Sequence, residues 1–507
     1  MESIRGELSH TNEVNEWRGR RVAVVGLGKS NLAVIRYLLR RGAEVSGRDQ
    51  KPLDQLGEIG EELRSYPIEL RLGPGYLEGL EEYDCVFLTP GISRHKPELV
   101  HLREAGVPVH SEIEIVLREC RAPILGITGT SGKTTTTTLV GKIMEASGRR
   151  TFVGGNIGQP LIEIAAEIPP DAVVVLELSS FQLEMLNQSP RGALVTNVSP
   201  NHLDMHADMA EYVAAKERIF LFQHPEDVAV FNLDNEYTRA MAQRARSRTF
   251  WFSLEREPVR GAWLEGENLL LRRGQGNQQG RAGRGEGEVE IVARREELLL
   301  PGLHNVANVL AACALTGAFG VPKEAMYRVI TTFRGVPHRL ELVGEGEVGG
   351  KPNVMFINDS IATTPARAVA GIRAMTRPTV LLAGGYDKHI PFDELAAELL
   401  RPGCPVQAVV LLGATAEKIE QAIDEARQQA IALGEQPRSL AVHRAGTFAE
   451  AVRLAAELVP AGGVVLLSPA CASYDMFRNF EERAAEFARL AGQLLGQSGS
   501  RAEAVKR

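Results

Sequence analysis

The sequence predicts an α/β protein built from several domains, and three observations lead to this prediction. The chain has 507 residues, which is more than one hydrophobic core usually holds, so about two to four domains are expected. Apolar, strand-like runs alternate with helical patterns along most of the chain, as they do in parallel α/β sheets. Glycine-rich turns join such a run to a helix near residue 27 and again near residue 130.

The composition excludes several classes of protein. Hydrophobic residues make up 44% of the chain, charged residues 24%, and the net charge of −7 argues against broad nucleic-acid binding, which needs a basic face. The five cysteines are scattered, without a C-x-x-C pair, which favours a reducing cytoplasm. Residues 1–20 lack an apolar signal core, and no apolar run approaches the roughly 18 residues of a membrane span.

The first block of the chain, residues 1–115, begins like a nucleotide-binding βαβ unit. An apolar run over 21–25 predicts a strand, Gly26-Leu27-Gly28 follows it as a tight turn, and apolar residues over 32–39 recur at helical spacing. Asn31 stands in place of the third glycine of the dinucleotide pattern G-x-G-x-x-G. The block therefore predicts a nucleotide-shaped site, and the glycines give only weak support to an NAD oxidoreductase.

The second block, residues 116–336, opens with the most informative segment of the chain, Gly126 to Thr135. An apolar run over 123–127 precedes this segment and a helical pattern over 134–146 follows it. Strand, glycine turn and helix together make a cradle whose backbone N–H groups and helix N-terminus bind phosphate. The alternative, a flexible Gly/Thr loop, does not account for the flanking strand and helix.

Lys133 and Thr134 occupy the chemically decisive positions of this phosphate loop. Lysine reaches the terminal phosphates of a nucleotide, and the hydroxyl of the next residue binds Mg²⁺. Ile127 stands where the strict pattern has its first glycine, so the match is not complete. We nevertheless expect the chain to bind a nucleoside triphosphate.

Polar residues follow the next two predicted strands. Glu177 ends an apolar run over 173–176, and a carboxylate at the carboxyl end of a strand in this sheet suits a Mg²⁺ ligand better than a surface role. His202 follows the next strand and could bind metal or phosphate, although a lone histidine is more often structural. Lys216 lies in a helical pattern over 211–220, where spacing alone predicts an exposed lysine.

The third block, residues 337–507, reads as another α/β unit. Arg339 lies at its start and could swing a charge onto a γ-phosphate, or simply pair with a surface carboxylate. Polar clusters at 358–360 and 468–473 end strands, and a substrate rim and ordinary turns explain them equally well. Cys471 is expected to be a buried apolar residue and not a nucleophile, because no histidine lies near it in sequence.

Taken in order, these segments resemble the Mur ligases of bacterial cell-wall synthesis, and the motifs span nearly the whole chain. The motifs that carry the resemblance are Gly126–Thr135, Gly154–Gly158, Leu176–Glu184, Asn197–Asp204, Ala215-Lys216, His304–Asn308, Pro337–Arg339, Asn358–Ser360, and Leu467–Ser473 with Asn479-Phe480.

The resemblance implies three domains and an activity. These are a Rossmann-like N-terminal domain for a UDP-sugar, a central P-loop-type ATPase domain, and a C-terminal Rossmann-like α/β domain for an amino acid. The implied reaction is an ATP-dependent amide ligation that adds D-glutamate to UDP-N-acetylmuramoyl-L-alanine through an acyl phosphate, forming ADP and phosphate for peptidoglycan synthesis. The expected enzyme is a cytoplasmic monomer without nucleic-acid partners and without a membrane span.

The resemblance also implies roles for individual residues. The ATP site would comprise Gly129, Thr130, Ser131, Gly132, Lys133, Thr134, Thr135, Asn308, Arg339 and Asp359. Two Mg²⁺ ions would be held by Thr134 and Glu177 and by His202 and a carbamylated Lys216. The UDP-substrate would contact Gly28, Lys29, Ser30, Gln50, Lys51 and Asn156. D-glutamate would lie against Thr363, Lys388, Ser473 and Phe480. The residues assigned to catalysis are Lys133, Glu177, His202, Lys216 and Arg339.

One departure from the family pattern bears on the amino-acid site. The family segment is often Asn-Asp-Ser-Lys-Ala-Thr, and its lysine helps to bind the glutamate carboxylate, whereas this chain has Ile361. The preference for D- over L-glutamate therefore stays open, as does the choice of another amino-acid ligase, such as an L-alanine- or diamino-acid-adding Mur ligase or a folylpolyglutamate synthase. A regulatory nucleotide-binding module without amide chemistry is a further alternative. The Gly/Arg-rich residues 274–287 predict a surface loop without assigned chemistry.

Overall fold

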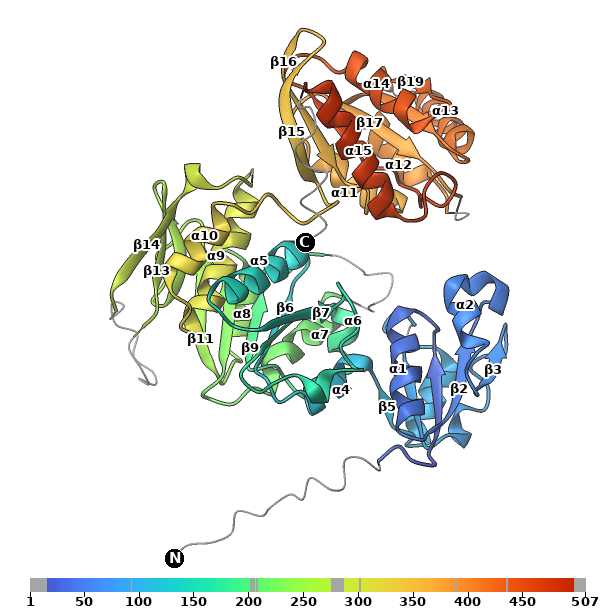
Figure 1. The fold of residues 1–507 in the computed structure, drawn as a ribbon, viewed down its shortest axis with the longest axis vertical. Coiled ribbons are helices and arrows are strands. Elements are labelled where there is room, and N and C mark those ends of the chain that lie inside the picture. The colour runs from blue at the N-terminus through green and yellow to red at the C-terminus, as the bar shows by residue number, and fades with distance from the viewer. Residues whose placement is uncertain are drawn as a thin grey trace, which may run out of the picture. The chain divides into compact units, whose positions relative to one another are not determined.

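The computed structural model describes residues 16–92, 94–200, 206, 208–274, 287–300, 302–387, 390–434 and 436–496. The chain divides after Phe333 into two compact units (Figure 1). The described residues form three sheets, of which two belong to the first unit and one to the second. Helices alternate with parallel strands in all three, so the predicted α/β class is confirmed.

The first sheet has the strand order β3-β2-β1-β4-β5, and its neighbouring strands are all parallel. The strand order reverses beside β1, and ligands of open α/β sheets bind at such a point, beyond the carboxyl ends of the strands. Its elements are β1 (Arg21–Val25), α1 (Lys29–Arg40), β2 (Glu44–Asp49), α2 (Glu58–Leu63), β3 (Glu69–Leu72), β4 (Cys85–Leu88), α3 (Pro97–Glu104) and β5 (Val109–His110).

Asn31, which replaces the third glycine of the dinucleotide pattern, ties the first turn to the end of β1. Its side-chain amide donates hydrogen bonds to the carbonyl oxygens of Val25 at 2.9 Å and Gly26 at 2.8 Å. The carboxylate of Asp49, at the end of β2, accepts from the backbone N–H of Leu27 at 2.7 Å. Two side chains therefore fix a turn that glycine alone would leave more flexible.

The second sheet is larger, with the order β14-β13-β12-β11-β10-β9-β6-β8-β7. Its neighbouring strands from β7 to β12 are parallel, while β13 and β14 add an antiparallel edge. The central strand β6 lies between β8 and β9, so this sheet too has a reversal, directly before the phosphate loop.

Four elements of this part, β6, α5, β8 and α7, agree to within about two residues with the runs predicted over 123–127, 134–146, 173–176 and 211–220. The strands are β6 (Ile124–Thr128), β7 (Thr151–Gly155), β8 (Val173–Glu177), β9 (Gly192–Val195), β10 (Val228–Asn232), β11 (Arg248–Ser253), β12 (Gly261–Glu265), β13 (Asn268–Arg272) and β14 (Val289–Arg294). The helices of this part are α4 (Glu112–Glu119), α5 (Lys133–Ala146), α6 (Ser180–Leu183), α7 (Met209–Leu221), α8 (Glu236–Ala242), α9 (Leu303–Ala318) and α10 (Lys323–Ile330). Helix α5 packs against α9 and α10.

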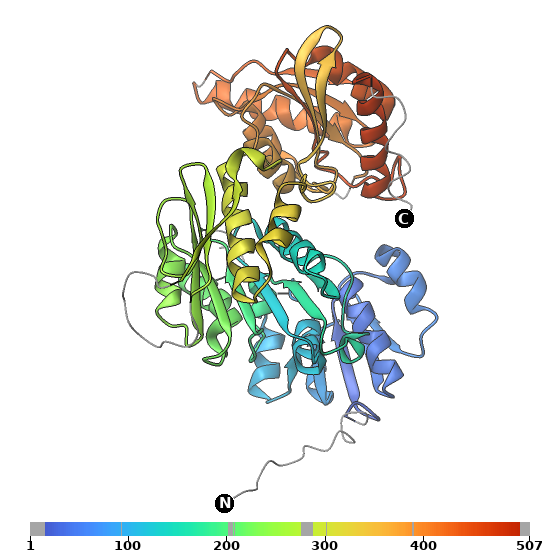
Figure 2. The same cartoon turned by 60° about the vertical axis from the view of Figure 1, so that its left-hand side comes forward.

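The third sheet, in the second unit, has the order β15-β16-β20-β17-β18-β19. Its strands are β15 (Glu341–Val348), β16 (Lys351–Asn358), β17 (Thr379–Gly384), β18 (Val406–Leu412), β19 (Ala441–Arg444) and β20 (Val464–Leu467). Its helices are α11 (Pro365–Arg373), α12 (Asp393–Leu400), α13 (Ala416–Ala432), α14 (Phe448–Leu458) and α15 (Phe480–Leu494). One core packs α11, α12 and α13 on one face, and a second packs α14 and α15 on the other (Figure 2).

Two features of the sequence prediction stay predictions. The domain limits 1–115, 116–336 and 337–507 remain predictions. Most of the predicted surface loop, residues 275–286, lies outside the described part of the chain. None of the described helices is both long and apolar enough to span a bilayer.

Candidate active site

The phosphate loop between β6 and α5 has a backbone that only glycine accommodates at two positions. Gly129 has φ +145°, and a Cβ there would lie 1.9 Å from the hydroxyl oxygen of Thr196. Gly132 has φ +82°, and a Cβ there would lie 2.2 Å from Oδ1 of Asn308. Both positions therefore require glycine for conformation and for space. Asn308, on α9, is thereby placed directly beside the loop, as its predicted ATP role requires.

The carboxyl end of β9 holds this loop in place. The side-chain oxygen of Asn197 accepts from the N–H of Ser131 at 3.0 Å, and its amide donates to the carbonyl of Ser131 at 3.0 Å. Thr196 also donates its hydroxyl to that carbonyl, at 2.6 Å. Sequence reasoning assigned no role to Thr196 or Asn197. Their position just after β9, next to the strand that leads into the phosphate loop, could have identified them.

Two lysines converge on the loop. Nζ of Lys133 donates to the carbonyl oxygens of Gly129 at 3.0 Å and Thr130 at 3.1 Å, and Nζ of Lys216 donates to that of Gly129 at 3.0 Å. Lys216 is only 1% exposed and lies over the ring of Tyr212. Burial, assisted by the charge of Lys133, lowers the pKa of Lys216 well below its ordinary value.

The exposed position that helical spacing predicted for Lys216 is therefore wrong. Helix α7 places Lys216 against the sheet, and that depends on tertiary packing, which the local pattern of the helix does not record. Lys133, Thr134 and Lys216 come from two helices that are distant in sequence, so only the fold brings them together.

Glu177 is buried at the end of β8, only 2% exposed, and the alternative of a surface glutamate is wrong. Its Oε1 accepts from the side-chain amide of Asn156 at 2.8 Å, and the N–H of Asn156 donates to the Glu177 carbonyl at 2.8 Å. Its Oε2 is buried, and no described residue forms a hydrogen bond with it. A buried carboxylate oxygen without a partner is costly unless another group satisfies it, and a hard cation such as Mg²⁺ would do so.

The donor set for a second cation is only partly described. His202 lies outside the described residues. In the described part of the chain, no group of three or more His, Cys, Asp or Glu side chains could by itself hold a metal ion. Phosphate oxygens and a hydroxyl are hard donors of the kind that would complete a Mg²⁺ site near Glu177.

Five of the six residues assigned to the UDP-substrate lie at the carboxyl edge of the first sheet. Gly28, Lys29 and Ser30 form the start of α1, and Gln50 and Lys51 follow β2. One carboxylate, that of Asp49, joins the two segments, because it accepts from the N–H groups of Leu27 and Lys51 at 2.7 and 2.8 Å. Asn156, beside Glu177, belongs to the second sheet of the same unit.

In the second unit, Asp359 is a buried carboxyl at the end of β16. It accepts from the Ser468 hydroxyl at 2.7 Å and from the N–H of Leu340 at 3.3 Å. Burial raises its pKa to about 7, and these hydrogen bonds and the charge of Arg339 oppose that rise. Arg339 itself is exposed between His338 and Leu340, whose φ values of 63° and 44° lie in the left-handed region. The strained residues are next to a predicted ATP contact.

The segments at 358–360 and 468–473 are joined by a residue that the sequence analysis missed, Arg483 of α15. Its guanidinium donates to two atoms of Ser360, the carbonyl oxygen at 2.9 Å and the hydroxyl oxygen at 3.0 Å. It also donates to the carbonyl oxygens of Cys471 and Ala472, at 3.1 and 3.2 Å. The Ser360 hydroxyl donates in turn to the carbonyl of Phe480 at 2.8 Å. Arg483 is 2% exposed, and burial lowers its pKa to about 10.

The other residues of the predicted amino-acid site differ in how the structure places them. Ser473 is buried, and its carbonyl accepts from the N–H groups of Met476 and Phe477. Thr363 is half-buried, close after Ile361, and Lys388 lies outside the described residues. The prediction that Cys471 is a buried apolar residue is confirmed, and burial raises the pKa of its thiol to about 11.

Matches to known protein families cover most of the chain. A model described as "Mur ligase MurD-like, N-terminal domain" matches residues 20–111, "Mur ligase middle domain" matches 127–316, and "Mur ligase, glutamate ligase domain" matches 338–471. The chain therefore belongs to the Mur ligase family and is a ligase, which confirms the resemblance drawn from the motifs.

Curated relatives make the assignment narrower. A protein of Symbiobacterium thermophilum is 46% identical over 94% of this chain and 98% of its own length, and one of Clostridium novyi is 43% identical over 95% and 99%. Both are named UDP-N-acetylmuramoylalanine–D-glutamate ligase. The crystal structure of UDP-N-acetylmuramate-alanine ligase from Thermotoga maritima matches with a TM-score of 0.51 at 19% identity, covering 94% of this chain and 99% of that one, which shows a shared fold.

Proposed function

We propose that this chain joins D-glutamate to UDP-N-acetylmuramoyl-L-alanine in an ATP-dependent ligation for peptidoglycan synthesis. The observation that carries the proposal is the phosphate loop, where the Nζ atoms of Lys133 and Lys216 both bond the Gly129 carbonyl. The buried Glu177, which ends the strand next to the loop strand, adds a carboxylate to this sheet edge. Relatives that are 39–46% identical over most of the chain carry the name of this activity.

The chemistry explains why a phosphate site is needed. A carboxylate is a poor acyl donor, because its leaving group would be oxide. Phosphorylation by ATP turns that oxygen into a phosphate leaving group, and the amine of D-glutamate then attacks the carbonyl carbon, with loss of phosphate and a proton. Lys133 and the loop N–H groups stabilise the charge on the phosphoryl oxygens during transfer. The chain's own task is to orient the three substrates and exclude water from the acyl phosphate.

Mg²⁺, when bound, would supply charge neutralisation at the phosphates. Thr134 and Glu177 would hold one ion, and the buried Oε2 of Glu177, with which no described residue forms a hydrogen bond, supports this role. His202 and a carbamylated Lys216 would hold the other. An ammonium group cannot bind a cation, whereas a carbamate offers hard anionic oxygens. A buried Lys216 beside the cationic Lys133 is a site where a negative carbamate would be stabilised.

The other substrate contacts are proposed from the family motifs and the positions of their residues. ATP would be contacted by the loop residues Gly129 to Thr135, by Asn308, Arg339 and Asp359. The UDP-substrate would lie along the first sheet at 28–30 and 50–51 and reach Asn156. The three domains that would bind these substrates would span residues 1–115, 116–336 and 337–507. The proposed enzyme would act as a monomer in the cytoplasm.

D-glutamate would be bound in the second unit by Thr363, Lys388, Ser473 and Phe480. The hydrogen bonds from Arg483 to Ser360 and from Ser360 to the Phe480 carbonyl support this, because they tie the segment just before Thr363 to Phe480. Each of these hydrogen-bonded residues restrains the others, and catalytic or binding sites depend on such support.

A phosphate-release assay tests the function directly. The full chain is supplied with ATP, Mg²⁺ and UDP-N-acetylmuramoyl-L-alanine, and then with D-glutamate, L-glutamate, L-alanine or meso-diaminopimelate. We expect phosphate release and product only with D-glutamate, and none when either the UDP-substrate or the amino acid is left out. Turnover with another amino acid would indicate a different amide ligase. Phosphate release independent of both acceptors would favour a regulatory nucleotide-binding module.

A further inference from the structure

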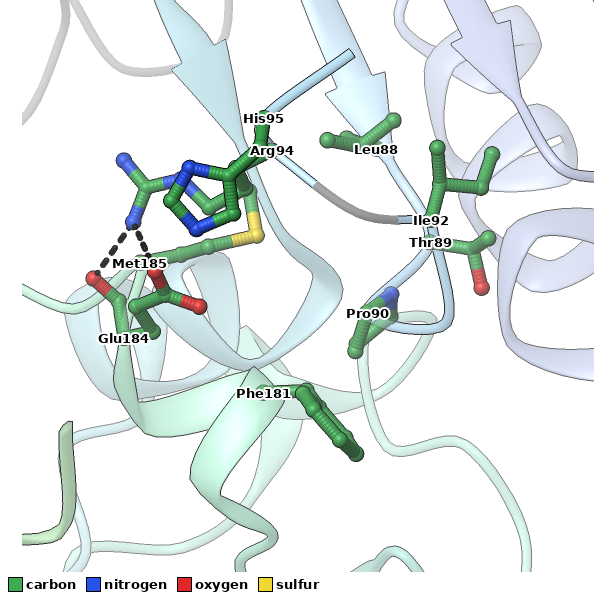
Figure 3. Close-up of a pocket in the computed structure, with 9 residues that line it drawn as sticks. All are labelled: Leu88, Thr89, Pro90, Ile92, Arg94, His95, Phe181, Glu184 and Met185. Carbon is green, nitrogen blue, oxygen red and sulfur yellow. Dashed lines mark hydrogen bonds and ion pairs between the residues drawn. The ribbon is translucent and has the colours of Figure 1, made fainter. Parts of the chain in front are cut away.

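A cavity of about 340 Å³ lies in the first unit beside the ion pair between Arg94 and Glu184. Arg94 precedes α3, and its guanidinium bonds both the carbonyl and the carboxylate of Glu184, at 3.1 and 3.2 Å (Figure 3). The same pair lines a smaller neighbouring pocket that contains Phe181, and Figure 3 shows that pocket. The larger cavity also has Arg103 and Arg218 in its wall.

Positive charge dominates this larger cavity. Three arginines line it, from the segment before α3, from α3 and from α7, and Glu184 is the one carboxylate in its described lining. Glu184 is engaged by Arg94. Arg103 donates to the carbonyl of Arg94 at 3.1 Å and Arg218 to that of Leu186 at 2.6 Å, and both acceptors are neutral.

The guanidinium groups also act on one another. Arg94, Arg103 and Arg218 all line the same cavity, so their positive charges repel one another. Like charges held together in a partly buried cavity are costly, and an anion bound between them removes that cost. The rest of the wall is apolar and includes Leu99 and Met185.

We propose that this cavity binds a small organic anion. Its phosphate or carboxylate group would be bound by Arg94, Arg103 and Arg218, and its apolar part would lie against Leu99 and Met185. The volume is at the lower end of the range for small-molecule sites, roughly 300–1,000 Å³. None of the residues proposed for the ligation is among the described residues that line the cavity.

The cavity also has a physical connection to the phosphate loop. Arg218 lies on α7, the helix that carries Lys216. Glu184 directly follows α6, the short helix that comes after Glu177 at the end of β8. An anion that pairs with Arg94 competes with Glu184 for the same guanidinium. A bound anion would therefore change contacts of α7 and of the segment after Glu177, both of which support the ligation site.

The experiment measures binding of two probe anions to the full-length chain by isothermal titration calorimetry. The probes are phenyl phosphate and phenylacetate, which distinguish a phosphate from a carboxylate ligand, and neutral benzyl alcohol is the control for a purely apolar site. Every measurement uses the Lys133→Ala background, which weakens phosphate binding at the ATP loop, and the arginine variants then identify the binding that belongs to the cavity. Arg103→Gln and, separately, Arg218→Gln are added to this background, and Arg64→Gln, an exposed arginine after α2, is the matched control.

We expect at least one anion to bind with one-to-one stoichiometry. Arg103→Gln and Arg218→Gln should each weaken binding roughly tenfold or more, the loss expected for a hydrogen bond to a charged group, while Arg64→Gln leaves it unchanged. Three results would overturn the proposal: no saturable binding of either anion, equal binding of benzyl alcohol, or equal affinity in the Arg103→Gln, Arg218→Gln and Arg64→Gln variants. None of these results depends on whether the chain ligates D-glutamate.

Discussion

The ammonium groups of Lys133 and Lys216 donate hydrogen bonds to one acceptor, the carbonyl oxygen of Gly129, each at 3.0 Å. Lys133 begins α5 and Lys216 lies within α7, so two helices deliver positive charge to one point of the phosphate loop. Two adjacent cations repel each other, and this repulsion contributes to the lowered pKa of Lys216. An anionic ligand or a carbamate on Lys216 would relieve it.

Lys133→Ala should abolish ligation while the protein stays folded, because the substitution removes a charge at the phosphates and no core contact. The expected loss of turnover is roughly a hundredfold or more, as for other preorganised electrostatic contacts. Lys142→Ala, an exposed lysine on the same helix, is the matched control and should retain full turnover. Steady-state phosphate release measures both variants. A Lys133→Ala enzyme within a few-fold of the parent rate would refute the assigned role.

Lys216→Ala should be nearly inactive if its carbamate binds Mg²⁺. A short carboxylate such as acetate should partly restore turnover, because it can supply oxygen ligands in the space that the side chain leaves. Carbon-13 NMR of the parent enzyme in labelled bicarbonate should show a carbamate signal that Lys216→Ala lacks. Full activity of Lys216→Ala, or the same signal in both proteins, would contradict the carbamate.

Much of the fold was predictable because the information is local. The strands around 124–128 and 173–177 are continuous apolar runs, and the glycines of the loop have conformations that their sequence position already indicates. Glu177 could be assigned for the same reason, since its place at a strand end follows from the length of one apolar run.

The support of the site was not predictable, because it is made by contacts between segments far apart in sequence. Asn197 holds Ser131 from another strand, and Arg483 joins two motifs from a helix that follows both. Lys216 occupies an ordinary helical position, and only the packing of α7 buries it. Periodicity reports which face of a helix is apolar, and it does not report which charged residue the fold places inside.

Glu112 should make the stability of the first unit depend on pH. It begins α4, it is buried, and it accepts from the N–H of Leu161 at 3.2 Å. Burial raises its pKa from 4.5 to about 7, although hydrogen bonds from Leu161 and Ile162 oppose the rise. The folded state therefore holds the proton more tightly than the unfolded state, so stability is fully present below the unfolded pKa and is lost as pH rises through about 7.

Glu112→Gln should remove this loss, because the amide oxygen can still accept the hydrogen bond and carries no charge. Relative to the parent, the variant should gain roughly 1–3 kcal/mol more at about pH 8 than at about pH 5. Thermal unfolding of both proteins at the two pH values measures the difference. Glu104→Gln, at the exposed end of α3, is the control and should follow the parent. If Glu112→Gln also follows the parent at both pH values, the Glu112 carboxyl is not the source of the pH-dependent loss of stability.

Ile361 leaves the predicted amino-acid pocket without the cation that the family often has at this position. Its backbone N–H donates to the His338 carbonyl at 3.1 Å, and its apolar side chain is half-buried. Arg483 is buried close by, but the contacts of its guanidinium are with Ser360 and with backbone carbonyls, so it positions the segments. The charge of a bound glutamate must then be met by another residue, and Lys388, which follows Gly385 beyond the end of β17, is the candidate.

Lys388→Ala should therefore raise the Michaelis constant for glutamate far more than that for ATP. The expected cost is about 1.5–3 kcal/mol, the range for a hydrogen bond to a charged group, which is roughly a ten- to hundredfold change. Ile361→Lys should leave ligation intact in the parent, because the pocket gains a second cation, and it should partly rescue Lys388→Ala for the same reason. Initial rates measured against each substrate in turn distinguish the two constants. Equal increases for glutamate and ATP in Lys388→Ala, without rescue by Ile361→Lys, would place Lys388 outside the amino-acid pocket.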